Sequence, residues 1–343
     1  MSRKSVSVGP SNISVILPTY QRPGLLRLCL ASLLQQTLPA CQIIVGRREN
    51  DFDSAAVIAE FAQQSDGLVR DAIVGPNDNL VCSMNAALAM TTGQLVALTD
   101  DDAEFPPDWL QRMVVVFDDE SIGGFGGRDI QATNPGEAET VGKLQWFGRI
   151  VGNHHLAIGP VRDVDVLKGV NCCFRGDVLR EIKFDRRLRG LGNVSNWELA
   201  VCFAFARRGY RLVFDPSLEV VHHTGPRQDG DSNNRGGFNG AAHSDSVFNE
   251  TLLVREHLPL LGRIGFAAWC LLIGTGSTPG LLQFPRLIAK EKGGEKHCSE
   301  CGSRSKVVRQ RFSVQPCRSV NFNDEASHYF TNGRAFWRNR ASP

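Results

Sequence analysis

Three adjacent carboxylates, Asp100, Asp101 and Asp102, directly follow a short apolar run. Their mutual repulsion is tolerable when a divalent cation neutralises them. Oxygen ligands at the rigid end of a strand suit Mg²⁺ or Mn²⁺, which commonly bridge to substrate phosphates. The alternative interpretation is a solvated acidic turn. A strand-end position favours the metal, so we expect a divalent cation and a phosphate-bearing substrate.

The elements that must position this cluster alternate between apolar strands and helical patterns. We expect, in order, a strand over residues 13–17, a helix with Pro23 in its first turn, a strand over 42–46, a helix over 53–63, a strand over 69–74, a helix over 79–92 and a strand over 94–99. This repetition predicts a doubly wound α/β fold whose parallel sheet is covered on both faces. Ligands bind outside the carboxyl ends of such strands.

The following region is richer in glycine and polar loops. It contains a helical pattern over residues 196–208 and a strand over 211–214 that we expect to turn at Asp215-Pro216. Residues 172–174, Cys-Cys-Phe, fit a buried strand. The order of these elements continues an α/β domain past the acidic cluster.

Several stretches, in their order and spacing, resemble the family 2 glycosyltransferases. They are ISVILPTYQRPGLLRLCLASLLQQT, QIIVG, NLVCSMNAALAMTTGQLVALTDDDAEFPPDWL, LKGVNCCFRGDVLREI with a following FD, and NWELAVCFAFARRGYRLVFDPSLEVVHH. The resemblance spans about residues 13–225 and implies a GT-A-type doubly wound, mostly parallel sheet with an acceptor-side subregion. After this region, the uncharged stretch 264–284 and the basic residues that follow it predict a helical C-terminal appendage that we expect to associate with a membrane.

The resemblance implies which residues hold the donor and the metal. Donor binding would fall on Pro18, Thr19, Tyr20, Arg22, Asn85, Asp100 and Asp101. We also assign Arg48 and Asp51 to donor binding, although their loop departs from the family. The Mg²⁺ or Mn²⁺ ion would be held by Asp100, Asp102 and His222, with His223 beside it. The alternatives are that Tyr20 simply packs and that the histidine pair is structural.

The loop at residues 46–51 departs from the family. The family has an Asp-Asp-Gly-Ser turn here that contacts the nucleobase, whereas this chain has Gly-Arg-Arg-Glu-Asn-Asp. The identity of the donor's nucleobase is therefore left open. The two arginines could instead clamp phosphate or lie in solvent.

The catalytic base departs from the family as well. Ser195 and Asn196 stand where the family has a Glu-Asp pair, and an amide cannot act as a general base. Glu198 and Asp185 are the remaining candidates, with Asn196 orienting the acceptor hydroxyl. The alternative for Glu198 is a capping box with Ser195. On the acceptor side, the resemblance points to Gly169 and Asn171 within residues 168–175.

The chain divides into four predicted parts. They are an N-terminal tail (1–12), a glycosyltransferase domain (13–228, with a nucleotide-binding half 13–120 and an acceptor half 121–228), a loop and apolar helical region (229–290) and a basic tail (291–343). Residues 264–284 carry no charged side chain, which leaves three interpretations: a membrane span, an interfacial segment or a buried helical hairpin. Cys298 and Cys301 in the tail are interpreted as solvated thiols rather than as a zinc site.

Charge and cysteine usage limit the partners and the compartment. The formal net charge is +2, but residues 286–343 hold 12 Lys and Arg against 5 Asp and Glu, which leaves the remainder acidic. An acidic body without a basic stripe excludes nucleic acid as a partner, whereas the basic stretch 286–311 favours peripheral contact with an anionic membrane surface. Ten irregularly spaced cysteines and the lack of an apolar leader predict a cytoplasmic protein at the inner face of the membrane.

Together these features predict an inverting glycosyltransferase that moves a sugar from a nucleotide-sugar donor to a glycan or a lipid-linked acceptor in cell-surface polysaccharide synthesis. The alternative is a catalytically silent homologue that binds a nucleotide sugar or a partner protein, because Asn196 replaces an acid. A nucleotidyltransferase is disfavoured, since PTYQRPG is a poor version of the Gly-rich first loop such enzymes need.

Overall fold

The computed structural model describes residues 12–131, 136–224, 228, 238–275, 278–283 and 285. The chain forms two compact units, Met1–Gln145 with Ile150–His257, and Trp146–Arg149 with Leu258–Pro343. Residues 1–11 of the predicted N-terminal tail, residues 229–237 of the predicted loop, and the basic tail 291–343 with Cys298 and Cys301 lie outside the described residues. Within the described part, the seven cysteines form no disulfide.

The first half of the larger unit follows the predicted alternation of strand and helix. Its elements are β1 (Ile13–Pro18), α1 (Pro23–Leu34), β2 (Gln42–Arg48), α2 (Phe52–Gln64), β3 (Val69–Val74), α3 (Leu80–Ala89) and β4 (Leu95–Leu98). Local chemistry sets several boundaries. Pro23 begins α1, where its missing N–H is tolerated, and the Asn79 side chain caps α3 by accepting a hydrogen bond from the Cys82 N–H.

The second half contains, among its described residues, both the longest and the shortest strands of this unit, together with four α-helices. Its elements are β5 (Ala103–Glu104), α4 (Trp109–Val116), β6 (Ile122–Ile130), β7 (Lys143–Leu144), β8 (Ile150–Val151), η1 (His154–Leu156), β9 (Arg162–Val164), η2 (Gly169–Asn171), β10 (Cys172–Arg175), α5 (Gly176–Ile182), α6 (Trp197–Arg207), β11 (Arg211–His222) and α7 (Gly240–His257). The buried strand predicted over residues 172–174 is therefore present as β10.

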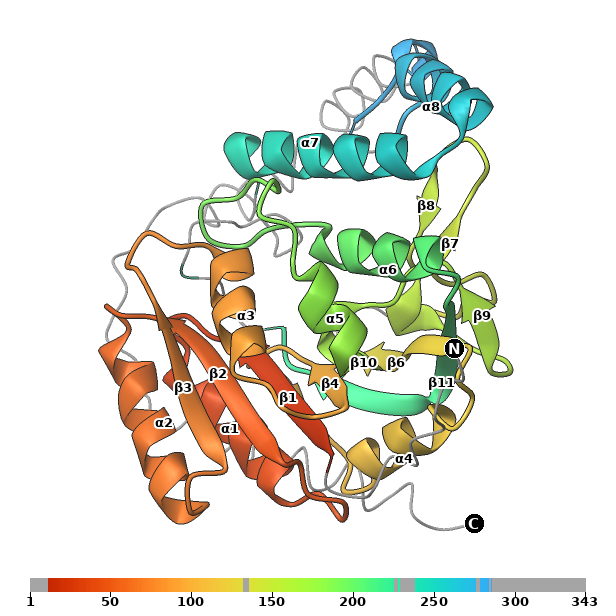
Figure 1. Ribbon diagram of the computed structural model, residues 1–343. Coiled ribbons are helices and arrows are strands. Elements are labelled where there is room, and N and C mark those ends of the chain that lie inside the picture. Colours follow the sequence, from red (N-terminus) through yellow and green to blue (C-terminus); the bar gives the residue numbers. More distant parts are fainter. Residues whose placement is uncertain are drawn as a thin grey trace, which may run out of the picture. The chain divides into compact units, whose positions relative to one another are not determined.

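The large sheet has the order β3-β2-β1-β4-β10-β6-β11-β5, with β9 also paired to β11 (Figure 1). Strands β3, β2, β1 and β4 run parallel, whereas β10 runs antiparallel to both of its neighbours. The chain leaves β1 toward β2 on one side and later returns to β4 on the other. This reversal opens a crevice at the carboxyl ends of β1 and β4, where α/β sheets bind ligands.

Side chains of the central strands alternate between two cores on opposite faces of the sheet. Ile13, Val15 and Leu17 of β1 pack in the core that includes residues of α1, α2 and α4. Ile16 faces the other way, into the core that includes residues of α3, α5 and α6. Because both faces of the strands are buried, the central strands are rigid supports for the loops at their ends.

The turn predicted at Asp215-Pro216 is wrong. Strand β11 continues through this dipeptide to His222, and its pairing with β6 shifts register between Asp215 and Glu219. A bulge of this kind accommodates Pro216, which has no N–H to donate to a ladder. The continuation pairs His222 with Ala103 of β5, next to the acidic cluster.

The smaller unit contains α8 (Leu260–Leu272) and the short helix η3 (Leu281–Gln283). In the part of the chain that the structure describes, no helix combines the length and apolarity that crossing a bilayer requires. The exposed side chains of this unit include Leu260, Leu261, Ile264, Leu271, Leu272, Ile273, Leu281 and Leu282. The interpretation of residues 264–284 as a buried helical hairpin is therefore not supported.

Candidate active site

A cavity of about 590 Å³ lies in the larger unit at the carboxyl ends of β1 and β4. Its walls include ten of the residues singled out from the sequence: Pro18, Thr19, Tyr20, Arg22, Arg48, Asp100, Asp102, Asn196, Glu198 and His222. These residues come from five separate stretches of the chain. The fold thus brings the predicted donor, metal and base positions into one cavity.

The acidic cluster divides between the cavity and the protein interior. Asp100 and Asp102 line the cavity, whereas Asp101 is fully buried and accepts a hydrogen bond of 2.6 Å from the Thr19 hydroxyl. Burial raises the pKa of Asp101 to about 7, although the Arg22 guanidinium acts in the opposite direction. The solvated-turn interpretation fails, and the donor contact predicted for Asp101 is replaced by interior contacts.

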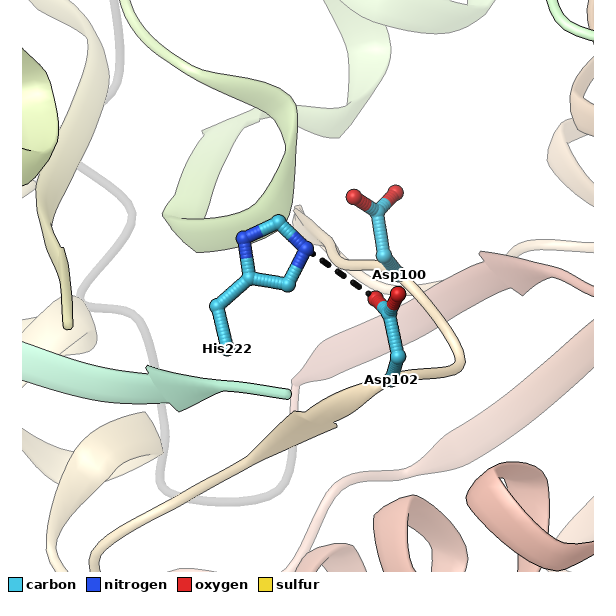
Figure 2. A group of neighbouring side chains, drawn as sticks. All are labelled: Asp100, Asp102 and His222. Atoms are coloured by element: carbon cyan, nitrogen blue, oxygen red, sulfur yellow. Dashed lines mark ion pairs between the residues drawn. The ribbon is translucent and has the colours of Figure 1, made fainter. Parts of the chain in front are cut away.

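Asp100, Asp102 and His222 point toward one another from two different strand ends (Figure 2). One potential ligand atom from each lies within 4.8 Å of the others. His222 Nε2 and Asp102 Oδ1 form an ion pair at 3.2 Å. Two adjacent ligand atoms on one cation would be about 3 Å apart, given metal–ligand bonds of about 2.1 Å. Two carboxylates and an imidazole therefore fit a divalent cation.

A proton and a metal ion would compete for His222 Nε2. Burial alone would lower the pKa of His222, but its contacts with Asp102 and Asp129 outweigh burial and raise the pKa to about 9. At neutral pH the imidazolium therefore supplies the positive charge that the carboxylates need. A metal that binds through Nε2 displaces that proton, so metal binding at this site releases acid.

Arginine and tyrosine side chains form the wall beside the first strand. Arg22 forms ion pairs with Asp101 and Asp102. The Arg48 guanidinium lies 4.3 Å from the centre of the Tyr20 ring and donates hydrogen bonds to two backbone carbonyls, those of Asp78 and Leu191. Arg48 is thus fixed in the cavity wall by its own contacts.

Two further predicted donor residues, besides Asp101, lie outside this cavity wall. Asp51 is buried, caps α2 by accepting from the Ser54 N–H and also accepts from the Gln21 N–H. Asn85 exchanges two hydrogen bonds with the main chain of Phe184. Both side chains hold neighbouring loops in place, since their polar atoms are directed at backbone groups.

Three residues predicted for the acceptor side or for catalysis also lie outside the cavity wall. Gly169 lets the Trp197 indole approach the backbone, because a Cβ there would lie 2.2 Å from the ring. Asn171 is fully buried and accepts a hydrogen bond from the Trp109 indole. Asp185 is paired with Arg187 and does not line the cavity. Its position removes Asp185 as a candidate base.

Glu198 lies at the start of α6 with its carboxylate in the cavity wall. Its Oε1 accepts a hydrogen bond of 3.4 Å from the Gly169 N–H, and the helix cap is Asn196, which makes no side-chain capping bond. The capping-box alternative is therefore not the arrangement present. Burial raises the pKa of Glu198 to about 6, with the charge of Asp100 adding to the effect. A carboxylate of this kind is a stronger base than a solvated one.

Asn196 has a left-handed backbone conformation, with φ of 67°. Its side chain donates a hydrogen bond of 3.1 Å to the Ser246 carbonyl of α7. The neighbouring loop is tied to the same helix, because the buried Asn249 bonds the main chain of Arg189 and Ser195. Helix α7 thus holds the loop that carries Asn196 over the cavity.

Sequence reasoning missed two charged residues beside the metal ligands. Asp129 is fully buried at the end of β6, and its Oδ2 lies 2.5 Å from Lys168 Nζ, which lines the cavity. Asp129 lies near the end of β6 and Lys168 directly before η2, and neither belongs to a cluster that stands out in the sequence. An acid that follows the apolar, glycine-rich run 122–127 was the available signal.

Residues 14–154 match the Glycosyl transferase family 2. The chain is 26% identical over 226 residues to a glucosyl-dolichyl phosphate glucuronosyltransferase of Haloferax volcanii, covering 61% of this chain and 68% of the relative. It is also 28% identical over 233 residues to an uncharacterised protein of Sinorhizobium fredii, covering 63% of this chain but 25% of the relative. An uncharacterised Mycobacterium tuberculosis protein is 29% identical over 161 residues, 46% of each chain.

Two solved structures share the architecture. GalNAc-T7 with UDP, GalNAc and Mn²⁺ superposes with a TM-score of 0.55 at 15% identity, over 71% of this chain and 48% of that one. Residues 1–349 of S. aureus TarS superpose with a TM-score of 0.52 at 14% identity, over 81% of this chain and 78% of that one. The sheet order and the placement of the site define a GT-A fold. The chain carries a family 2 glycosyltransferase domain.

Proposed function

We propose that this protein is an inverting glycosyltransferase that moves a sugar from a nucleotide-sugar donor to a glycan or a lipid-linked acceptor. The observation that carries the proposal is the convergence of Asp100, Asp102 and His222 in a cavity that also contains Glu198. The Haloferax relative is named for a dolichyl phosphate-linked sugar, which supports a lipid-linked acceptor. We place the reaction in cell-surface polysaccharide synthesis, in the cytoplasm at the inner face of the membrane.

Each group in the cavity has a role in this reaction. A Mg²⁺ or Mn²⁺ ion held by Asp100, Asp102 and His222 would take up charge that develops on the leaving nucleoside diphosphate. Tyr20 and the stacked Arg48 offer a flat, cationic surface for the nucleotide. Glu198 accepts the proton of the acceptor hydroxyl as that oxygen attacks the anomeric carbon. A single attack on the face opposite the leaving group inverts the configuration.

The first prediction concerns the donor. In a thermal-shift screen of UDP-, GDP- and dTDP-sugars with Mn²⁺, we expect one nucleotide class to raise the melting temperature, because a ligand stabilises the state that binds it. At a ligand concentration of 100 times Kd the stabilisation is about 2.7 kcal/mol. The same screen in EDTA is the control. Equal shifts with and without the chelator would contradict a role for the metal in donor binding.

A catalytically silent homologue is the competing proposal, and Asn196 at the expected base position is the observation that favours it. Such a protein would bind the donor without turning it over. Release of free nucleoside diphosphate by the wild-type protein, with or without an acceptor, separates the two proposals. Measurable turnover excludes the silent homologue.

The exposed apolar side chains of α8 support a peripheral membrane contact. Leu261, Ile264 and Leu271 are all exposed on this helix. The sequence that follows, 286–311, is basic. Apolar side chains that enter the headgroup region, together with basic residues that attract anionic lipids, give reversible binding. A lipid-linked acceptor would be reached from such a position.

We predict that the triple variant Leu261→Glu/Ile264→Glu/Leu271→Glu lowers the fraction of protein that floats with anionic liposomes at least about tenfold. Each change removes apolar area that the lipid would bury and adds a negative charge that the anionic lipids repel. The matched control is Val115→Glu, which changes an exposed apolar residue of the larger unit. Equal flotation of the triple variant and the wild type would defeat the membrane proposal.

A further inference from the structure

Asp129 is a fully buried carboxylate beside the metal ligands. Its Oδ2 receives three contacts: His222 Nδ1 at 3.2 Å, Lys168 Nζ at 2.5 Å and Gln131 Nε2 at 2.6 Å. It comes from β6, whereas His222 ends β11 and Lys168 precedes η2. Three separate parts of the fold therefore meet at one carboxylate oxygen that does not itself line the cavity.

The two nitrogens of the His222 ring face different carboxylates. Nδ1 makes a hydrogen bond with Asp129, whereas Nε2 forms an ion pair with Asp102 Oδ1 at 3.2 Å. An imidazole that ligates a metal through Nε2 must carry its remaining proton on Nδ1, and the group that accepts this proton fixes the tautomer and the ring orientation. Asp129 is placed to accept it.

We propose that Asp129 is a positioning residue that orients His222 as a metal ligand through Nε2, and that Lys168 holds Asp129 in place for this task. This inference rests on the proposed metal site. Lys168 also precedes Gly169, whose N–H bonds Glu198. The same short segment thus supports the metal ligands on one side and the candidate base on the other.

A purely structural ion pair between Lys168 and Asp129 is the competing explanation, and metal binding separates the two. We expect Asp129→Asn to weaken Mn²⁺ binding about 10–100-fold, the range seen when the group behind a ligating histidine is lost. The dissociation constant is measured from the electron paramagnetic resonance signal of free Mn²⁺. Electron spin-echo modulation reports the imidazole nitrogen bound to Mn²⁺, and we expect this modulation in the wild type and its loss in Asp129→Asn and in His222→Ala.

The matched control is Asp163→Asn, which makes the same change in an exposed carboxylate paired with Arg211. We expect its Mn²⁺ affinity and nitrogen modulation to equal those of the wild type. If Asp129→Asn does not fold, Lys168→Gln decides the matter: a several-fold weaker Mn²⁺ affinity that Lys168→Arg restores supports the proposal.

Three outcomes would overturn the inference. Unchanged Mn²⁺ affinity and modulation in a folded Asp129→Asn, beside a wild type that binds Mn²⁺, refute the positioning role alone. Unchanged affinity in Lys168→Gln, where Asp129→Asn is unfolded, does the same. Failure of the wild type to bind Mn²⁺ refutes the proposed metal site and this inference with it.

Discussion

Replacing Asp102 with asparagine is expected to reduce metal-dependent sugar transfer at least about 1000-fold. The carboxylate lies 3.2 Å from His222 Nε2 and 2.8 Å from Arg22 Nη1. It therefore links the candidate metal ligand His222 to the Arg22 guanidinium in the cavity wall. An amide is a weaker ligand and carries no charge. Losing the stabilisation that a metal gives a leaving diphosphate, several kcal/mol, corresponds to a rate loss of this order.

The measurement is kcat/KM at saturating Mn²⁺, with the melting temperature in EDTA as a check on folding. Asp108→Asn is the matched control, because Asp108 is exposed and makes no capping hydrogen bond at the start of α4. We expect the control to retain wild-type activity. If Asp102→Asn remained fully active, or if EDTA left wild-type transfer unchanged, the metal role of this cluster would be wrong.

The sequence predicted the first half of the fold, residues 13–120, because its central strands are buried on both faces. Runs such as residues 13–17 and 94–99 are mostly apolar, and the helices between them have clear starts at Pro23 and Asn79. Such local signals determine the parallel sheet and hence the edge at which ligands bind. The location of the cavity was therefore predictable.

The sequence did not reveal which of the adjacent side chains at that edge face the cavity and which are buried in the interior. Asp100, Asp101 and Asp102 are equivalent in composition, but the turn directs Asp101 into the interior toward Thr19. The register shift in β11 was likewise unpredictable, because Pro216 alone indicates a turn. Only the family resemblance selected His222, since the turn predicted from the residues would have ended its strand.

Glu198 carries the second large prediction, because its burial should affect stability and catalysis in opposite directions. We expect Glu198→Gln to lower kcat/KM about 100–10,000-fold, the usual contribution of a general base. The substitution removes the proton acceptor but keeps the size of the side chain and its ability to accept from the Gly169 N–H. In the wild type, kcat/KM should rise with pH as Glu198 ionises around its pKa of about 6.

The substitution Glu198→Gln should lower kcat/KM but raise the free energy of unfolding at high pH. Burial raises the pKa of Glu198 from 4.5 to about 6, so the folded state favours the protonated form. This contribution to stability is fully present below the unfolded pKa and is lost as pH rises through about 6. Above that pH the wild type therefore bears a penalty of about 2 kcal/mol that the glutamine variant avoids.

Denaturant unfolding in EDTA at pH 4.5 and pH 8 measures this difference. We expect Glu198→Gln to equal the wild type at pH 4.5 and to exceed it at pH 8. The matched control is Glu60→Gln on the surface, which should show neither the gain at high pH nor the loss of activity. A variant that loses activity together with stability at pH 8 would indicate a structural carboxylate, and a fully active Glu198→Gln would remove this residue from the mechanism. A stabilised but inactive variant is the outcome that a buried general base requires, since the desolvation that makes Glu198 basic is also what makes its charge costly to the fold.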